Sequence, residues 1–126
     1  MQRTFIRLGA IMAMLSVAIG AFGAHLLEPT IGAEAMETYE TGVQYHMMHA
    51  LGIILVAIAA GQWGDSRRLK WAGWLLFAGI IIFSGSLYVL SISGIKMLGA
   101  ITPIGGVSFI VGWLLLVLEA SSRPKA

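Results

Sequence analysis

The sequence predicts an all-α membrane protein, a single domain over residues 1–126 in which four transmembrane helices form an up-down-up-down bundle. The first observation is composition, because 58% of the residues are hydrophobic and only 11% are charged, whereas roughly a quarter are charged in soluble domains. The second is that the charged residues leave four long windows without Asp, Glu, Lys or Arg. The third is that nearly all the basic residues lie at the two ends of the chain or between the second and third windows.

The four uncharged windows have 20 to 25 residues each and cover residues 8–27, 41–64, 71–95 and 97–118. A helix rises about 1.5 Å per residue and needs ~20 residues to cross a hydrocarbon core of ~30 Å. A helix of a soluble bundle would also carry a polar stripe every three or four residues, and the windows have none. We therefore expect membrane spans at approximately 5–27, 42–63, 71–94 and 98–118.

The first window needs separate treatment because Arg3 and Arg7 precede an apolar run that ends in small residues. Secretory signal peptides share that pattern. However, the run is longer than the hydrophobic stretch of about 7–15 residues that is usual in a signal peptide. We interpret it as a retained first helix.

The connection between the first two windows carries four of the six acidic residues and no basic one. Its carboxylates recur at a spacing of three and its apolar side chains at a spacing of four: Glu34, Glu37, Glu40, and Ile31, Ala35, Tyr39. This pattern predicts a short amphipathic helix lying at the outer membrane interface. A solvated loop is the alternative.

The basic residues predict the orientation. Seven of the eight lie before the first window, between the second and third, or after the fourth: Arg3, Arg7, Arg67, Arg68, Lys70, Arg123, Lys125. Only Lys96 lies on the other side. The positive-inside rule therefore places both termini and the central connection in the cytoplasm.

Small residues predict how the helices pack, because they let backbones approach closely in lipid. We assign this role to Gly20, Ala24 and Gly85, and we expect Gly105 and Gly106 to permit local bending beside Pro103.

Two further packing predictions concern the fourth helix. Pro103 predicts a kink or a late start of this helix, since proline lacks a backbone N–H. If the first and fourth helices are neighbours, Arg7 and Glu119 would pair near the cytoplasmic headgroups.

Polar side chains concentrate toward the outer face and form the candidate site: His25, Tyr45, His46, His49, Ser84, Ser86, Tyr88, Thr102. One interpretation is that the histidines brace the helices by hydrogen bonds. A second is a divalent metal held by His25, His46 and His49 with Glu40 as fourth ligand. Haem ligation and a pH-sensing role are further alternatives. The His-x-x-His spacing is a weak metal signal, since zinc protease helices use i, i+4.

Several function classes are disfavoured. The chain has no cysteine, which removes disulfides and thiolate metal sites, and its net charge of +2 is too small to indicate a nucleic-acid partner. No Asp, Glu, Lys or Arg lies in the middle of a window, which argues against a proton-coupled pump. No catalytic grouping or nucleotide fingerprint is present, so we expect no enzymatic activity.

The same polar blocks carry a family resemblance. The blocks are GAFGAH at 20–25, YHMMHAL at 45–51, SGSLY at 84–88, TPIGG at 102–106 and GW at 112–113. They resemble the YgdD/YwdK-type small inner-membrane proteins, a family of unknown function, over nearly the whole chain. The resemblance implies a multi-pass protein of the bacterial inner membrane, and no activity, cofactor or substrate.

We therefore expect a non-enzymatic integral membrane protein with a structural or accessory role. The alternative is a binding protein or small-solute permease that uses the outer His/Tyr/Ser cluster, and a metal or haem redox protein ranks third. The expected partner is the lipid bilayer, and a homo-oligomer is compatible with the packing. We predict no cofactor, with a divalent metal as the one exception left open.

Overall fold

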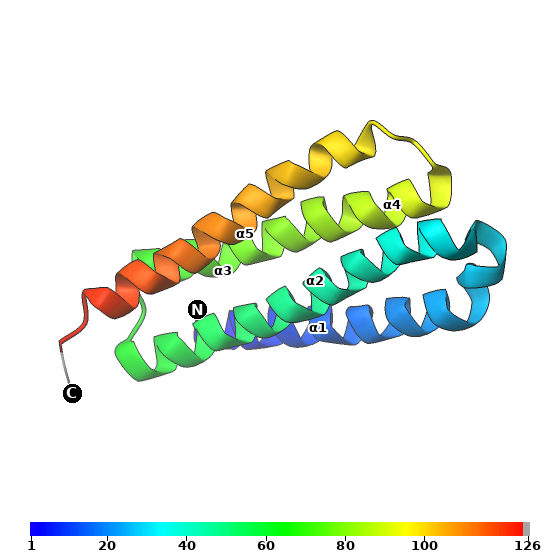
Figure 1. Ribbon diagram of the computed structural model, residues 1–126. Coiled ribbons are helices and arrows are strands. Elements are labelled where there is room, and N and C mark those ends of the chain that lie inside the picture. The colour runs from blue at the N-terminus through cyan, green and yellow to red at the C-terminus, as the bar shows by residue number, and fades with distance from the viewer. Residues whose placement is uncertain (125–126) are drawn as a thin grey trace.

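The computed structural model describes residues 1–124, and within that range the secondary structure is entirely helical (Figure 1). The elements are α1 (Gln2–Phe22), η1 (Gly23–Leu27), α2 (Glu28–Trp63), α3 (Arg67–Gly79), η2 (Ile80–Ser84), α4 (Gly85–Ser93) and α5 (Leu98–Ser121). The two η elements are single π-helical turns inside longer helices. The predicted all-α class is confirmed.

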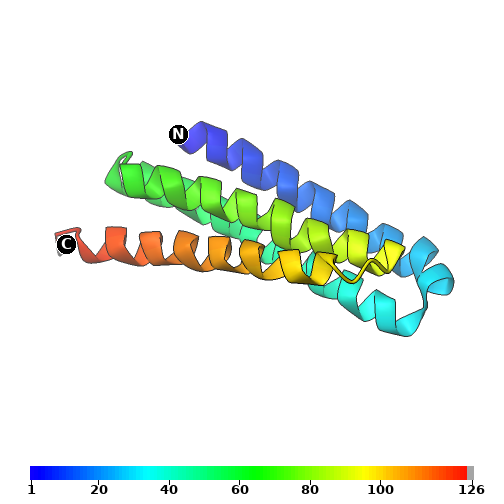
Figure 2. The same ribbon diagram turned by 90° about the horizontal axis from the view of Figure 1, so that it is seen from above.

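Three continuous helical stretches are long and apolar enough to cross a membrane: Gln2–Trp63, Arg67–Ser93 and Leu98–Ser121. The first of them reverses direction at Gly32, whose φ of 86° and ψ of 170° are not helical. Essentially only glycine adopts this backbone region. After Gly32, α2 runs back beside α1, as the two views in Figures 1 and 2 show.

The segment predicted to lie flat at the outer interface is the beginning of α2. Glu34, Glu37 and Glu40 are exposed and Tyr39 is buried, so the predicted division of faces is confirmed. Its predicted placement is wrong, because Gly32 is the one non-helical residue in α2 and the helix then continues to Trp63. Tyr39 packs against α1 near Gly23 and keeps the segment on the bundle.

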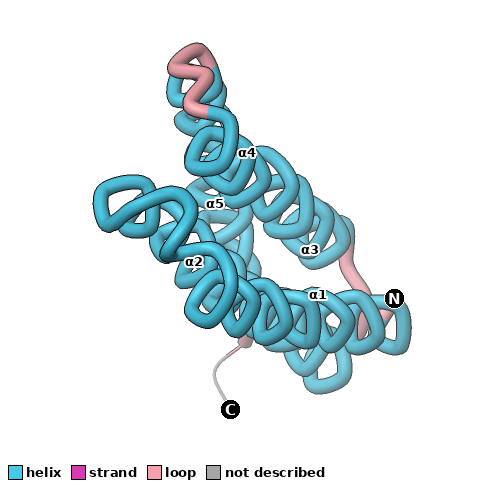
Figure 3. Tube along the Cα trace, turned by 90° about the vertical axis from the view of Figure 1, so that its right-hand side faces the viewer, coloured by secondary structure: helices cyan, strands magenta, loops and turns pink. Residues whose placement is uncertain are grey.

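The helices pack mainly as α1 with α2 and α3 with α5, and α2 also contacts α3 and α4 (Figure 3). The core lies between α1, α2 and α3, where large side chains are fully buried: Phe5, Ile53, Val56, Leu69, Leu76. Glycines allow this packing, since the ring of Phe5 lies directly against Gly73.

Two of the glycines singled out in the sequence lie at close contacts between helices. Gly105 faces the backbone of Phe83, and a Cβ at Gly20 would lie 3.2 Å from Val43. The assignment of Gly85 is wrong, because a Cβ there would meet nothing within 4 Å.

The other two small residues make looser contacts. A Cβ at Gly106 would reach the ring of Phe83 only at 3.8 Å, an ordinary distance. Ala24 is exposed. The spacing pattern identifies small residues but not the ones that face a neighbouring helix.

The predicted late start of the fourth helix is also wrong. α5 begins at Leu98 and remains helical through Pro103 to Ser121. Its first turn is formed by bonds from Leu98 and Gly99 to the carbonyls of Ile95 and Lys96. Pro103 therefore removes one hydrogen bond in the second turn without ending the helix.

The condition for pairing Arg7 with Glu119 is not met, because α5 packs against α3 rather than α1. Glu119 is 4% exposed. Its two carboxylate oxygens lie 3.6 Å from Arg68 Nη1 and 2.9 Å from Arg123 Nη2. Arg7 is exposed on α1, and Lys125, predicted to be cytoplasmic, lies outside the described residues.

Candidate functional site

His49 lies between α2 and α5 and uses both of its ring nitrogens. Nδ1 donates to the Tyr45 carbonyl at 2.8 Å, and Nε2 accepts from Trp113 Nε1 at 3.0 Å. An indole N–H can only donate and a carbonyl can only accept. The pair of bonds therefore fixes His49 as the neutral tautomer with its proton on Nδ1. The ring also stacks on Phe109, with centroids 3.5 Å apart.

Helical spacing produces this arrangement. His49 follows Tyr45 by four residues, so the ring reaches back to the carbonyl one turn earlier. Phe109 and Trp113 are also four apart and share one face of α5. Sequence reasoning missed both as site residues, although their i, i+4 spacing in an apolar helix was a signal for a shared face.

His46 lies one turn away and is 3% exposed. Its Nδ1 is 2.8 Å from the hydroxyl of Tyr88 on α4. Its Nε2 is turned toward the backbone of Met12 on α1 and makes no hydrogen bond within the described part of the chain. His46 is thus enclosed by side chains and backbone from α1 and α4.

The predicted hydroxyl groups also bond between helices. Ser84, the last residue of η2, donates to the Gly42 carbonyl of α2 at 2.7 Å. Ser86 and Thr102 lie with their hydroxyl oxygens 2.5 Å apart and join α4 to α5. A serine in a helix commonly bonds its own backbone, and Ser84 instead reaches a neighbouring helix.

Tyr39 is a further member that sequence reasoning placed only on an apolar face. Its hydroxyl donates to the Ile19 carbonyl of α1 at 2.6 Å, and its ring lies 5.3 Å from that of Tyr88. Tyr45, by contrast, is 36% exposed. It contributes its carbonyl to His49 and its ring to a contact with Phe83.

The predicted metal ligands are not brought together. His25 and Glu40 are exposed, and residues 1–124 contain no group of three His, Cys, Asp or Glu side chains that could hold a metal ion. Gly23 and Leu27 occupy the buried face of η1. His25 lies two residues from each, on the opposite face, and therefore points away from His46 and His49.

A second polar cluster, also missed, lies at the end of the bundle that holds the basic residues. Arg68 Nη1 donates to Ser122 at 3.0 Å and Arg123 Nη1 to the Trp63 carbonyl at 2.6 Å. With Glu119 between the two arginines, the cluster joins the ends of α2, α3 and α5. The i, i+4 spacing of Glu119 and Arg123 was the signal for it.

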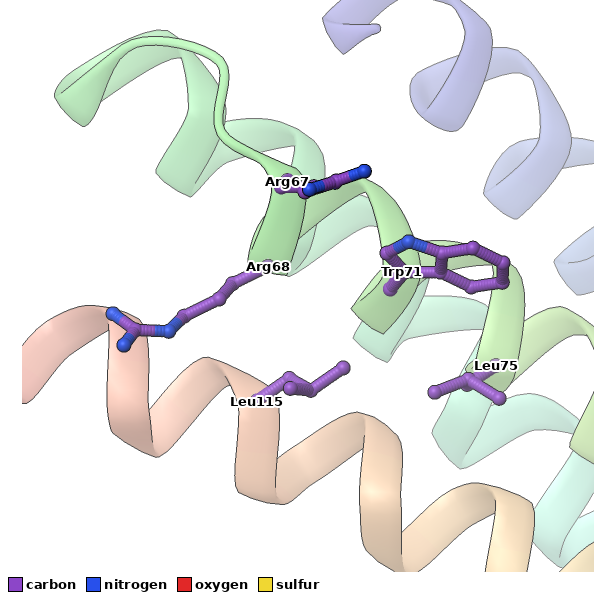
Figure 4. A pocket seen from close by; sticks show the side chains of 5 residues that line it. All are labelled: Arg67, Arg68, Trp71, Leu75 and Leu115. Atoms are coloured by element: carbon purple, nitrogen blue, oxygen red, sulfur yellow. The ribbon is translucent and has the colours of Figure 1, made fainter.

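Six of the eight predicted polar side chains thus bond between helices: His46, His49, Ser84, Ser86, Tyr88 and Thr102. A shallow groove lies between α3 and α5 and is lined by Arg67, Arg68, Trp71, Leu75 and Leu115 (Figure 4). The chemistry that this arrangement supports is hydrogen bonding that fixes neighbouring helices.

Comparisons with known proteins agree with a membrane location. The profile of a family described as protein of unknown function (DUF423) matches residues 19–106. The UPF0382 membrane protein YwdK of Bacillus subtilis is 53% identical over 119 residues, which cover 94% of this chain and 97% of the relative. A UPF0382 membrane protein of Staphylococcus haemolyticus is 50% identical over 118 residues, covering 94% and 95%. No solved structure matches the chain.

The profile covers well over half of the chain, and the relatives are similar along nearly their whole length. These matches confirm the predicted family resemblance. The chain belongs to the DUF423 family, and the relatives named above are bacterial membrane proteins.

Proposed function

We propose that this chain is a four-span protein of the bacterial cytoplasmic membrane with a non-catalytic, structural or accessory role. In this proposal both termini and the α2–α3 connection are cytoplasmic, and the outer polar cluster holds the helices together. The observation that carries the proposal is His49, whose two ring nitrogens are both used in hydrogen bonds that leave no free ligand atom.

The remaining bonds of the cluster support the same role. They join α1 to α2 through Tyr39, α2 to α4 through His46 and Tyr88, and α4 to α5 through Ser86 and Thr102. Lipid tails are as apolar as the side chains, so the hydrophobic effect does not drive helices together in a bilayer. Hydrogen bonds between helices contribute roughly 0.6–2 kcal/mol each there.

The reversal at Gly32 supports the count of four spans. It divides the Gln2–Trp63 stretch into α1 and a returning α2 that lie side by side. The start of α1, the α2–α3 connection and the end of α5 lie toward the same end of the bundle (Figures 1 and 2). Six of the described basic residues lie there: Arg3, Arg7, Arg67, Arg68, Lys70, Arg123. The positive-inside rule makes this end cytoplasmic.

Single-cysteine labelling tests the span count and orientation, because the chain has no cysteine of its own. Glu37→Cys and Asp65→Cys both replace exposed residues. With a membrane-impermeant maleimide on intact cells, we expect labelling of E37C at once and of D65C only after permeabilisation. Equal labelling of both variants in intact cells would contradict the proposed topology.

Thermal unfolding in detergent with and without Zn²⁺ tests the bracing role. We expect His46→Ala and His49→Ala each to lower the Tm, because both remove bonds between helices, and Zn²⁺ to leave the Tm of the unsubstituted protein unchanged. Stoichiometric zinc binding that His46→Ala abolishes would contradict the proposal.

A further inference from the structure

The groove between α3 and α5 has charged side chains at one end and uncharged side chains along the rest of its length. It has a volume of about 230 Å³ and is lined by Arg67, Arg68, Trp71, Leu75 and Leu115. Figure 4 shows Arg68 extending toward α5 and Arg67 lying on the side of Trp71. The two arginines stand at the first turn of α3, whereas the other three side chains form walls without charge.

The charged and the apolar side chains of the groove lie at different depths in the bundle. Leu75 lies seven residues after Arg68 on α3, which places it about 10 Å deeper along the helix. Leu115 precedes Glu119, the partner of Arg68, by one turn of α5. The groove is therefore cationic at the end of the bundle and apolar toward its middle.

Positive charge remains at the mouth of the groove. Arg67 has no ion-pair partner among residues 1–124. Glu119 lies closer to Arg123, at 2.9 Å, than to Arg68, at 3.6 Å, so it neutralises Arg68 only in part. Asp65 lines a different groove, on the side of α1.

We propose that this groove binds an anionic phospholipid such as phosphatidylglycerol. Guanidinium groups match the geometry of phosphate oxygens, and basic pockets between transmembrane helices on the cytoplasmic side recognise anionic headgroups. Arg68, which extends toward α5, contacts the phosphodiester, and Arg67 adds positive charge on the side of Trp71 (Figure 4). One acyl chain lies along Trp71, Leu75 and Leu115. A zwitterionic lipid fits the apolar walls equally well but carries no net charge for the arginines.

This inference rests on the proposed membrane topology, and native mass spectrometry of detergent-purified protein tests it. Phosphatidylglycerol and phosphatidylcholine with the same acyl chains are added at equal concentration. We expect preferential binding of phosphatidylglycerol and about a fivefold loss of its affinity in Arg67→Gln, since one juxtamembrane arginine contributes about 1 kcal/mol. Phosphatidylcholine is expected to lose less affinity in this variant, because its choline ammonium offsets the charge of its phosphodiester.

Arg3→Gln is the matched control, because it removes one exposed positive charge from the same end of the bundle but outside the groove. We expect it to leave phosphatidylglycerol affinity unchanged. Equal losses in Arg3→Gln and Arg67→Gln, or equal binding of the two lipids by the unsubstituted protein, would overturn the proposal.

Trp71→Ala tests the apolar part and is expected to weaken both lipids. Undiminished phosphatidylglycerol binding in this variant would overturn the placement of the acyl chain. Each variant is also made in the E37C and D65C backgrounds. A failure of lipid selectivity with an unchanged labelling pattern refutes the groove alone, whereas a changed pattern refutes the topology on which it rests.

Discussion

At the scale of single residues, His49 combines burial with complete hydrogen bonding. A buried polar group without a partner costs about 1–3 kcal/mol, and the His49 ring avoids this cost through the Tyr45 carbonyl and the Trp113 indole. Stacking on Phe109 adds a contact on the face of the ring. The histidine is held by three residues from two helices.

Trp113→Phe removes the donor to His49 Nε2 and keeps an aromatic ring. We expect a loss of about 1–3 kcal/mol in the free energy of unfolding, because Nε2 is left without a partner inside the bundle. Thermal unfolding in detergent measures it. Trp71→Phe is the control at an exposed position, and an equal fall in Tm for both variants would contradict the assigned bond.

Arg68→Gln tests the partner of Glu119 that the structure shows, and Arg7→Gln tests the partner that was considered from the sequence. The Arg68 side chain is 45% exposed, so solvent screens the pair and we expect Arg68→Gln to cost only about 1 kcal/mol. Arg7→Gln should leave the Tm unchanged. A larger effect from Arg7→Gln, measured by the same unfolding experiment, would show that α1 rather than α3 supplies the partner.

Sequence reasoning at this scale located polar positions better than it located their partners. The spacing of His46 and His49 predicts a shared face of one helix, but Tyr88 and Trp113 are far away in the chain. His25 illustrates the opposite error. It belongs to the same outer region as the other histidines, yet its position on the helix turns it away from them. Local spacing does not encode which distant helix supplies a bond.

At the scale of elements, close approach between helices depends on individual glycines. Gly105→Ala would place a Cβ against the backbone of Phe83, which cannot move aside as a flexible side chain can. We expect a loss of about 1–3 kcal/mol or more from this overpacking. Gly85→Ala is the matched control, since nothing lies within 4 Å of its added Cβ. A comparable fall in Tm for both variants would refute this packing of α5 on η2.

Gly32 determines where the chain reverses between α1 and α2. Gly32→Ala places a Cβ on a backbone with φ of 86° and ψ of 170°, and we expect a cost of about 1–3 kcal/mol. No atom lies within 4 Å of the added Cβ, so any loss of Tm reports backbone strain rather than a clash. An unchanged Tm would mean that the reversal does not require this conformation.

Window length predicts membrane spans and not the ends of helices. The third span is expected at 71–94, and α3 begins earlier, at Arg67, because the Ser66 hydroxyl accepts from the Leu69 N–H and caps the helix. Hydropathy does not detect a cap among charged residues. The π-helical turns were also not expected, although η2 positions Ser84 for its bond to Gly42.

For the molecule as a whole, composition was sufficient to predict the fold class but not which helices pack against each other. Long windows without charged residues indicate helices that are surrounded by lipid, and these windows predicted an all-helical membrane protein. The sequence left open whether the first and fourth helices are neighbours, since small residues mark a contact face but not the helix that it contacts. Phe5 against Gly73 and Phe109 against Gly79 set the arrangement instead, by joining α1 to α3 and α5 to α3.

His49 is expected to be neutral and to bond across two helices of a lipid-embedded bundle. Solid-state ¹⁵N NMR of histidine-labelled protein in lipid bilayers measures this state, with Trp113→Phe used to assign the His49 signals. We expect a proton on Nδ1 and an Nε2 signal that is shifted by the Trp113 hydrogen bond and unaffected by Zn²⁺. A charged imidazolium at neutral pH, a proton on Nε2, or a zinc-dependent shift would show that His49 does not brace α2 against α5.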